Sequence, residues 1–436
     1  MRSVRRVDCV VIGAGQAGLA MSRCLTDRGV AHVVLERGRV AERWRSERWE
    51  SLRLLTPNWQ ARLPAFRYDG PDPDGYMTMA EVVGYLERYA ASFDAPVRTG
   101  VEVREVTRDG RGFRVRTSRG TWRAATVVIA TGYAQVPRMP ALATQFPRDV
   151  VHLVPTAYRR PAQLAPGGVL IVGASSSGVQ LADELLRAGR DVTIAVGQHT
   201  RLPRRYRGRD SLWWLDRMGI FDETVDQVYD VEISRDQPSL QLVGHPDHRT
   251  LDLADLRARG ARVVGRLVGV DGTTAQFADD LVATTAAADI KLASLLHRID
   301  TYVAVQGLEA PQPPNFVPHC LGFDGAETSL DLGTAAVSTV IWATGFRREY
   351  PWLRVPVLGA RGEIRHDGGI TPVPGLYALG LHFLRRRNSS FLDGVGTDAA
   401  ALSDHLTRLL SRGVAAARGA ARDTRATPAL ALGPAS

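Results

Sequence analysis

Short apolar runs alternate with helically spaced apolar positions at the start of the chain. Residues 7–12 form a largely apolar run that is continuous from Cys9, a glycine-rich turn occupies 13–18, and residues 19–28 repeat apolar side chains at helical spacing. A second apolar run follows and ends at Glu36. Continuous apolar runs on either side of a helix are typical of strands buried on both faces. The pattern therefore predicts a βαβ unit built on a parallel sheet.

The same order of elements recurs in the middle of the chain. Residues 169–172 predict a strand, 173–178 a turn rich in glycine and serine, 179–187 a helix, and 192–196 a further strand. The first glycines of the two turns are 160 residues apart, which indicates a duplicated domain rather than a short repeat. We therefore predict an α/β fold with two Rossmann-like dinucleotide-binding domains.

Two further apolar runs, 126–132 and 339–345, each end in Ala-Thr-Gly. We interpret them as returning strands whose ends lie beside a dinucleotide. Because the second run follows the second βαβ unit, we expect the second domain to be inserted in the first. A last helix is expected to begin near Asp393 or Gly394. The predicted boundaries are 1–162 with 325–413 for the first domain, 163–324 for the second, and 414–436 for a disordered tail.

The first turn, Gly13-Ala-Gly15-Gln-Ala-Gly18, fits the GxGxxG pattern that binds dinucleotides between a strand and a helix. Its first glycine permits the tight turn, its second lets the backbone approach a pyrophosphate, and its third lets the helix pack on the strand. The pyrophosphate then lies at the helix N-terminus, where free N–H groups favour anions. Glu36, at the end of the next strand, is placed to bond ribose hydroxyls, so we predict a bound dinucleotide here.

The second turn, Gly173-Ala-Ser175-Ser-Ser-Gly178, carries serine in its middle position, and serine hydroxyls can donate to phosphate. The position that matches Glu36 holds no acidic residue, and Arg201 follows shortly after it. Loss of the carboxylate with a gain of arginine is the pattern expected for a 2′-phosphate, which favours NADPH over NADH. The alternative interpretation is that these arginines form a solvated face.

The amino-acid composition narrows the range of possible partners, metals and cellular locations. The formal net charge of +9 arises almost entirely from arginine, because Lys291 is the one lysine in the sequence. The arginines are scattered rather than gathered in a stripe, so we expect no nucleic-acid partner. Cys9, Cys24 and Cys320 form neither a CxxC pair nor a metal-ligand spacing, which predicts no disulfide framework and no metal. No apolar run is long enough for a membrane span or a signal segment, so we expect no membrane partner and a cytoplasmic location.

These motifs resemble those of the class B flavin-dependent monooxygenases, and more closely a bacterial flavoprotein subgroup often labelled "involved in potassium transport". The resemblance extends over nearly the whole chain, up to about residue 412, and includes both turns and both Ala-Thr-Gly runs. The further segments that carry it are Glu36-Arg37-Gly38, Glu42-Arg-Trp44-Arg45, Ser51-Leu-Arg-Leu-Leu-Thr-Pro57, Arg204-Arg-Tyr-Arg-Gly-Arg-Asp210 and 385–396.

The resemblance implies FAD in the first domain and NADPH in the second, with hydride passing from NADPH to the flavin. It further implies that O2 adds to the flavin as a C4a-(hydro)peroxyflavin, which oxygenates a small organic substrate at a heteroatom or a carbonyl carbon. One alternative is an NADPH-dependent flavin dehydrogenase or oxidase without oxygen transfer. Another is a non-enzymatic redox nucleotide sensor. The substrate and the oligomeric state stay open at this point.

The resemblance also implies which residues hold the cofactors. Trp44, Arg45 and Thr56 would lie beside the flavin, Val103 would contact the adenine through its backbone, and Asp393 would set the last helix near the flavin pyrimidine. Arg45 and Asn58 are the catalytic candidates. The full set of expected cofactor-binding residues is Gly13, Gly15, Gln16, Ala17, Gly18, Glu36, Arg37, Trp44, Arg45, Thr56, Val103, Ala130, Thr131, Gly132, Gly173, Ser175, Ser176, Ser177, Gly178, Arg201, Ala343, Thr344, Gly345 and Asp393.

One departure concerns the family fingerprint F-x-G-x-x-x-H-x-x-x-W/Y. Counted from Phe146, His152 falls in the histidine position, but Arg148 takes the glycine position and Thr156 the aromatic one. The incomplete pattern weakens a specific prediction of Baeyer–Villiger chemistry and favours His152 as an ordinary loop residue. Residues whose roles also stay open are Trp213, Trp214 and Arg385.

Overall fold

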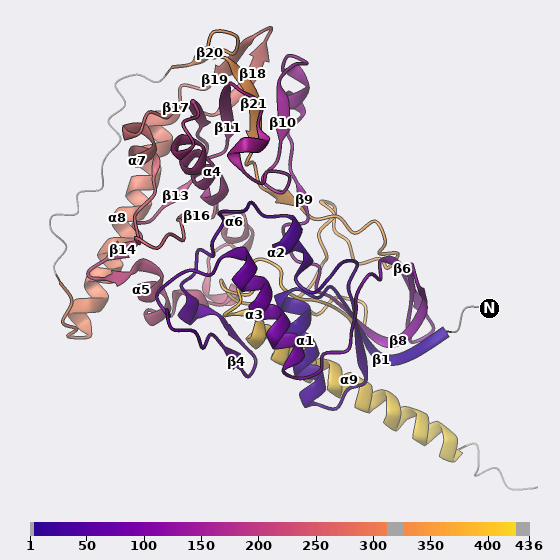
Figure 1. The fold of residues 1–436 in the computed structure, drawn as a ribbon. Helices are drawn as coiled ribbons and strands as arrows, with labels where there is room; N and C mark the ends of the chain where they lie inside the picture. The colour runs from indigo at the N-terminus through magenta and orange to yellow at the C-terminus, as the bar shows by residue number, and fades with distance from the viewer. Residues whose placement is uncertain (1–3, 312–326, 424–436) are drawn as a thin grey trace, which may run out of the picture.

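The computed structural model describes residues 4–311 and 327–423, with the backbone alone for 413–423. Two lobes, each built on its own sheet, lie side by side, and helix α9 (Val395–Asp423) projects from the lobe that contains the N-terminal strand (Figure 1). Cys320 lies outside the described residues.

The first lobe is organised by a seven-stranded mixed sheet. In spatial order its strands are β5 (Val97–Arg98), β2 (His32–Leu35), β1 (Val4–Ile12), β8 (Gly120–Ile129), β7 (Gly112–Thr117) and β6 (Val103–Asp109), and β23 (Leu376–Ala378) joins β8. β1 runs parallel to both of its neighbours, so Val10 and Val11 are fully buried. That burial explains the continuous apolar run in the sequence.

The second lobe has a five-stranded sheet in which all neighbours are parallel. In spatial order its strands are β10 (Val151–Leu153), β21 (Val337–Trp342), β11 (Gly168–Val172), β12 (Val192–Ala195) and β17 (Arg262–Val264). Its central strand β11 is buried along its whole length. Both lobes are therefore Rossmann-like, as the repeated βαβ pattern predicted.

Helices pack against the sheets of both lobes. α1 follows β1 and packs against α9, and α4 follows β11 and packs against α7. The helices are α1 (Gln16–Asp27), α2 (Glu42–Ser46), α3 (Met79–Ala91), α4 (Ser176–Arg187), α5 (Ser211–Arg217), α6 (Val231–Arg235), α7 (Leu253–Ala258) and α8 (Leu281–Val305), together with α9. The short strands outside the two main sheets are β3 (Arg62–Leu63), β4 (Phe66–Arg67), β13 (Thr200–Arg201), β14 (Arg205–Tyr206), β15 (Arg209–Asp210), β16 (Leu240–Gln241), β18 (Leu267–Asp271), β19 (Thr274–Phe277) and β20 (Ser329–Asp331).

The chain leaves the first lobe and returns to it at one place. β9 (Val136–Pro137) pairs antiparallel with β22 (Phe346–Arg347), and the N–H of Arg138 donates to the carbonyl of Gly345 at 2.9 Å. Because β23 then rejoins the first sheet, the second domain is inserted in the first, as predicted.

The predicted domain boundaries need correction at both crossings. β21 pairs with both β10 and β11 in the second sheet, although the prediction places β10 (within 1–162) and β21 (within 325–413) in the first domain. The two Ala-Thr-Gly runs look alike in the sequence, but hydrogen bonding assigns each to a different sheet. The crossing therefore lies near residues 137 and 346 rather than 162 and 325.

The expectation of a disordered tail from residue 414 is wrong for residues 414–423. α9 continues to Asp423, so the backbone of 414–423 is helical. This stretch is rich in alanine and arginine, which have high helix propensity even without a regular apolar stripe. Residues 424–436 lie outside the described part of the chain.

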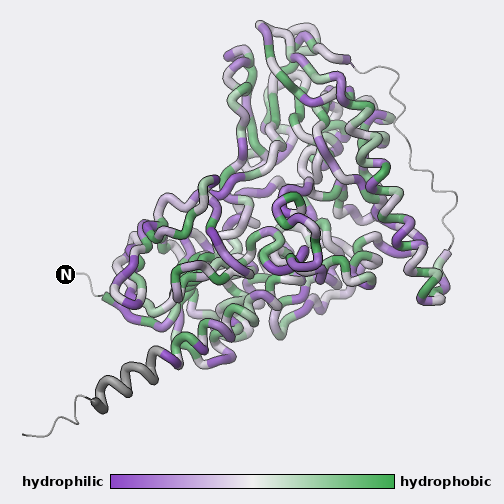
Figure 2. Tube along the Cα trace, turned by 180° about the vertical axis from the view of Figure 1, so that it is seen from behind, coloured by the Kyte–Doolittle hydropathy of each residue, from purple (hydrophilic) through white to green (hydrophobic). Residues whose placement is uncertain are grey.

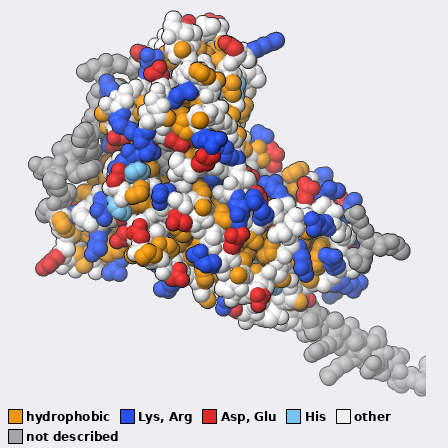
Figure 3. All heavy atoms as spheres, in the orientation of Figure 1, with side chains coloured by type: hydrophobic (Ala, Val, Ile, Leu, Met, Phe, Trp, Pro, Cys, Tyr) orange, Lys and Arg blue, Asp and Glu red, His pale blue; other side chains and the backbone are white. Residues whose placement is uncertain are grey.

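Hydrophobic residues follow the strands of both lobes and the part of α9 that joins the body (Figure 2). Among the helices of the described ranges, none is long and apolar enough to cross a membrane. On the face drawn in Figure 3, basic and acidic side chains are interspersed over both lobes. No continuous basic stripe is visible on that face, in keeping with the scattered arginines of the sequence.

Candidate dinucleotide and flavin sites

The first glycine turn is closed against the end of β8. Gly13 has φ of +106°, and a Cβ there would lie 2.6 Å from the carbonyl oxygen of Ala130. A Cβ on Gly18 would lie 1.8 Å from the carbonyl oxygen of Gly13. Both positions therefore require glycine, because any side chain would push apart the turn, the helix and the strand end.

The same turn leaves room and donors for an anion. A Cβ on Gly15 would meet nothing within 4 Å. Among the described side chains none caps α1, and its first turn holds no acid. The N–H groups of Gln16, Ala17 and Gly18 thus point into an open cradle, which fits a pyrophosphate.

The Glu36 side chain reaches this turn from the end of β2, a position that suits a ribose ligand. Its carboxylate accepts hydrogen bonds from the N–H groups of Ala14 and Gly38, both at 2.8 Å. The carbonyl of Glu36 also accepts from Val101, which brings the segment leading to Val103 beside the same strand end. Each carboxylate oxygen keeps a lone pair for a ribose hydroxyl, so the residues present fit the adenosine half of FAD.

The second glycine turn repeats this geometry. Gly173 has φ of +108°, and a Cβ there would lie 2.5 Å from the carbonyl oxygen of Ala343. A Cβ on Gly178 would again lie 1.8 Å from the first glycine's carbonyl oxygen. α4 begins after Ser175 with no capping side chain among the described residues and no acid in its first turn, so this turn is also fit for a pyrophosphate.

The two Ala-Thr-Gly runs and the serines of the second turn make specific contacts. The carbonyl oxygens of Ala130 and Ala343 lie against the first glycines of their own turns, as described above. The hydroxyl of Thr131 accepts from the Gln135 side-chain amide at 2.6 Å, and the hydroxyl of Thr344 donates to the carbonyl of Arg138. The hydroxyl of Ser176 accepts from Gln180 at 3.1 Å, while Ser177 is half-buried in the first turn of α4. Gly132 and Gly345, with φ of +79° and +84°, end the two runs and turn the chain away.

A chain of hydrogen bonds marks the flavin side of the first turn. The indole N–H of Trp44 donates to the Gln16 Oε1 at 3.4 Å, and the Gln16 Nε2 donates to the carbonyl of Ser390 at 3.2 Å. Two buried polar atoms beside it, the Oγ of Ser390 and the Oδ1 of Asn388, have no hydrogen-bond partner among the described residues. Buried polar atoms without partners are rare, so these two atoms fit a bound flavin that would supply their hydrogen-bond partners. Sequence reasoning did not single out Ser390 or Asn388, although both lie within the 385–396 run.

Asp393 lies just before α9, where it was expected. Its Oδ1 accepts from the Arg62 Nε at 2.5 Å, and the Arg62 Nη2 donates to Asp216 at 2.7 Å. Burial raises the pKa of Asp393, and the Arg62 guanidinium lowers it in part. These residues line an open hollow of about 890 Å³ beside the start of α9.

The two catalytic candidates, Arg45 and Asn58, bond to groups outside the series of hydrogen bonds that links Trp44 to Ser390. The Arg45 guanidinium donates to Glu87 of α3 and to the Val40 carbonyl, so its charge is already paired. The Asn58 side chain donates to the Asp72 carbonyl and accepts from the Met77 N–H, both at 2.8 Å. Asn58 therefore holds the loop that follows it, and the catalytic roles of Arg45 and Asn58 stay predictions.

Arg201 does not present a free cation to a 2′-phosphate. It is buried between two carboxylates, with Nη1 2.5 Å from Asp289 and Nη2 2.7 Å from Asp252. Its charge is therefore neutralised inside the lobe, which contradicts the predicted role. Burial also lowers the pKa of the neighbouring His199, which favours the neutral imidazole. Of the other expected residues, Arg37 is exposed and pairs with Glu47 at 3.3 Å, and Thr56 is half-buried.

The structure shows the contacts of the residues whose roles the sequence did not decide. His152 accepts from the Trp342 indole at 2.9 Å in the core of the second lobe, and burial lowers its pKa. Trp214 is buried and donates to the Tyr206 carbonyl at 2.8 Å. Trp213 is half-buried, with the guanidinium groups of Arg209 and Arg217 over its ring. Arg385 donates to the Gly368 carbonyl at 2.7 Å.

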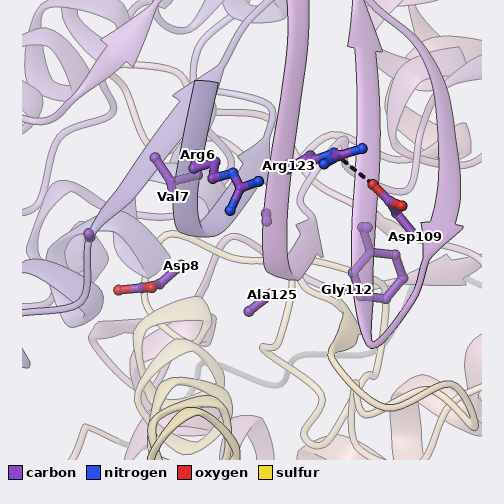
Figure 4. Close-up of a pocket in the computed structure, with 10 residues that line it drawn as sticks. Arg6, Val7, Asp8, Asp109, Gly112, Arg123 and Ala125 are labelled. Carbon is purple, nitrogen blue, oxygen red and sulfur yellow. Dashed lines mark ion pairs between the residues drawn. The ribbon is translucent and has the colours of Figure 1, made fainter. Parts of the chain in front are cut away.

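A separate hollow of about 520 Å³ lies at the other end of the first sheet (Figure 4). It is lined by Arg6, Val7 and Asp8 at the start of β1, whereas the glycine turn follows the end of that strand. Arg123 and Asp109 pair at 2.9 Å on its far side. This hollow is thus not part of the dinucleotide sites. Among the described residues no group of histidine, cysteine and carboxylate side chains forms a metal site.

Comparison with known proteins agrees with this geometry. Residues 10–219 match the family described as pyridine nucleotide-disulphide oxidoreductase. An uncharacterized CzcO-like oxidoreductase of Geobacillus kaustophilus is 31% identical over 396 residues, which cover 90% of this chain and 96% of the relative. The indole-3-pyruvate monooxygenase YUCCA1 of Oryza sativa is 33% identical over 43% of this chain and 47% of its own length. A flavin-containing monooxygenase structure from Stenotrophomonas maltophilia, 23% identical, aligns with a TM-score of 0.65 over 93% of this chain and 99% of that one.

Proposed function

This chain belongs to the CzcO-like oxidoreductases, within the class B flavin monooxygenase-like family, and we propose that it is an FAD- and NADPH-dependent monooxygenase. In this proposal it transfers one oxygen atom from O2 to a small organic substrate by way of a C4a-(hydro)peroxyflavin. The flavin supplies the redox chemistry when bound, and the protein binds, orients and shields it.

The observation that carries the proposal is the pair of matching glycine turns. In each turn no described side chain caps the helix N-terminus, and each turn is closed by the alanine of its own Ala-Thr-Gly run. Two sites of this kind in one chain suit a hydride donor and a flavin acceptor. Only the first site has a carboxylate at the strand end, which suits FAD there and the nicotinamide dinucleotide at the second.

Two observations support oxygen transfer over disulfide reduction. The two cysteines of the described chain, Cys9 and Cys24, are buried, and burial raises the pKa of Cys9 to about 12 and that of Cys24 to about 11. Thiols held neutral in this way are poor redox nucleophiles. The relative YUCCA1 of Oryza sativa, 33% identical over 43% of this chain, is named as an indole-3-pyruvate monooxygenase.

The test uses protein reconstituted with FAD and reduced anaerobically by NADPH or, separately, by NADH. The reduced protein is mixed with O2 and its absorbance is followed over time. Rapid reduction followed by a long-lived C4a-adduct band is the expected result. Reduction followed by direct reoxidation with release of hydrogen peroxide would instead identify a dehydrogenase or oxidase. Dinucleotide binding without reduction would identify a sensor.

A further inference from the structure

Helix α2 and the segment that follows it contain a repeated Glu-Arg-Trp, at 42–44 and at 47–49. The two copies have different surroundings. Arg43 of the first copy pairs with Glu47 at 2.6 Å. Arg48 of the second copy makes its hydrogen bond to a backbone carbonyl, that of Glu47, at 2.8 Å. Across the described ranges, no carboxylate forms an ion pair with Arg48.

Arg48 is therefore a half-buried cation in a locally positive environment. Glu47, the acid closest in sequence, is shared between Arg43 at 2.6 Å and Arg37 at 3.3 Å. Burial lowers the pKa of Arg48, and the guanidinium groups of Arg43 and Arg159 lower it further, while Tyr133 and Glu47 raise it in part. A guanidinium removed from water without a counter-charge is unfavourable, so a partner from outside the chain would stabilise this arrangement.

The backbone of Arg48 is held at the seam between the lobes. The Arg159 guanidinium, from the segment that leads into β11, donates to the carbonyls of Ser46 and Arg48. The Arg159 carbonyl in turn accepts from the Glu50 N–H at 2.9 Å. The next residue, Trp49, is buried in the core of the second lobe. These contacts fix the position of the Arg48 backbone, and therefore of its Cα.

The Arg48 side chain lies beside the flavin end of the first turn. Its guanidinium carbon is 5.5 Å from the centre of the Trp44 ring. The Trp44 indole donates to Gln16, the residue that bonds to Ser390. Arg48 is thus linked through one aromatic ring to the residues that fit the flavin.

A neutral aromatic group completes the surroundings. Tyr133, just after the first Ala-Thr-Gly run, is 42% exposed, and its charged neighbours are Arg48 and Arg43. The Tyr133 ring lies 5.8 Å from that of His382, whose pKa is lowered by burial. Around neutral pH both rings are uncharged, so Arg48 is the charged member of this group.

We propose that Arg48 binds a carboxylate of the substrate, so that the substrate class is a small organic acid with an apolar or aromatic body. The planar guanidinium matches a carboxylate in a bidentate pair, and Trp44 and Tyr133 provide apolar surface for the rest of the molecule. This inference rests on the proposed monooxygenase function. A phosphate group of the bound dinucleotide is the other anion that could occupy the same position, and the experiment separates the two.

The experiment compares benzoate with benzamide, which has the same shape but no charge. Binding to the FAD-loaded protein is measured by isothermal titration calorimetry and by the perturbation of flavin absorbance. The variants are Arg48→Gln and Arg48→Lys. The matched control is Arg160→Gln, an exposed arginine at the same seam that pairs with Glu50 at 3.5 Å. NADP⁺ affinity is measured on every variant.

The expected result is that the wild type prefers benzoate and that Arg48→Gln weakens benzoate by about tenfold or more, which corresponds to about 1.4 kcal/mol. Benzamide and NADP⁺ affinities should stay within about twofold, Arg48→Lys should recover part of the preference, and Arg160→Gln should change nothing. Equal loss of benzoate and benzamide, or no preference in the wild type, would overturn the proposal. A loss confined to NADP⁺ would assign the anion to the dinucleotide and also overturn it.

These outcomes are independent of the oxygen reaction. If the wild type selects benzoate through Arg48 but forms no C4a adduct with O2, the monooxygenase proposal fails and the carboxylate site stands. If the adduct forms but Arg48 makes no difference to benzoate, the reverse holds.

Discussion

The carbonyl oxygen of Ala343 lies 2.5 Å from the point where a Cβ on Gly173 would stand. In the first domain the carbonyl oxygen of Ala130 has the same relation to Gly13, at 2.6 Å. The alanine of each Ala-Thr-Gly run therefore closes the glycine turn of its own domain. Because the two closures are separate, each nucleotide site can be disturbed without the other.

Gly173→Ala should weaken NADPH binding by about tenfold or more and leave FAD binding intact, since the added Cβ displaces the second turn. Gly13→Ala should yield protein depleted in FAD for the same reason in the first domain. FAD content and NADPH titration check both. Gly189→Ala is the control, because φ is +73° there but nothing lies within 4 Å of a Cβ. It should cost about 1 kcal/mol of stability without changing NADPH affinity. Parallel loss of both cofactors in either turn variant would contradict the separation.

Arg201→Ala should lower stability rather than change dinucleotide preference. Removing the guanidinium leaves the half-buried Asp252 and Asp289 without this partner, which costs up to about 3–5 kcal/mol. Chemical denaturation measures the stability, and Michaelis constants for NADPH and NADH measure the preference. The exposed Arg205→Ala is the control and should leave stability nearly unchanged. A selective rise in the Michaelis constant for NADPH in Arg201→Ala would return this residue to the 2′-phosphate.

Glu36→Gln should weaken FAD by about 10- to 100-fold, because the charged acceptor shared by the turn and the ribose becomes a neutral amide. Equilibrium dialysis of FAD against the apoprotein measures the effect. Glu102→Gln, an exposed acid close to the same strand end, is the control. Unchanged FAD affinity in Glu36→Gln would exclude the carboxylate as a ribose ligand.

Asp398, fully buried at the start of α9, should make stability depend on pH. Burial raises the pKa of Asp398 to about 6, against an ordinary value of 3.8. The folded chain therefore holds a proton that the unfolded chain has already released between about pH 4 and 6. Stability falls over that range, and above it the full penalty, about 3 kcal/mol, is present.

Asp398→Asn should accordingly raise the melting temperature at pH 7.5 and leave it nearly unchanged at pH 4. Asp404→Asn, on the same helix but exposed and paired with Arg28 at 2.7 Å, is the control and should show no such pH dependence. A gain of equal size at both pH values would contradict the titration of Asp398. Thermal unfolding of the FAD-loaded protein at both pH values provides the measurement.

Local pattern was enough to predict the two βαβ units, their glycine turns and the position of Glu36. These features depend on near neighbours in the chain: strand periodicity, the φ that a turn requires, and the distance from a turn to the end of the next strand. The insertion of one domain in the other also followed from the order of the motifs. The boundaries did not, because identical Ala-Thr-Gly runs carry no information about which sheet they join.

Only the tertiary structure decided which charged side chains are free to act. Arg45, Arg48 and Arg201 are equivalent in the sequence as arginines near a predicted cofactor site. Folding pairs Arg45 with Glu87 and Arg201 with two aspartates, and it leaves Arg48 without a carboxylate partner in the described chain. The sequence by itself determined where the two glycine turns lie, because such turns depend on local backbone geometry. The availability of a charge depends on carboxylates from distant segments, and only the folded chain brings those together.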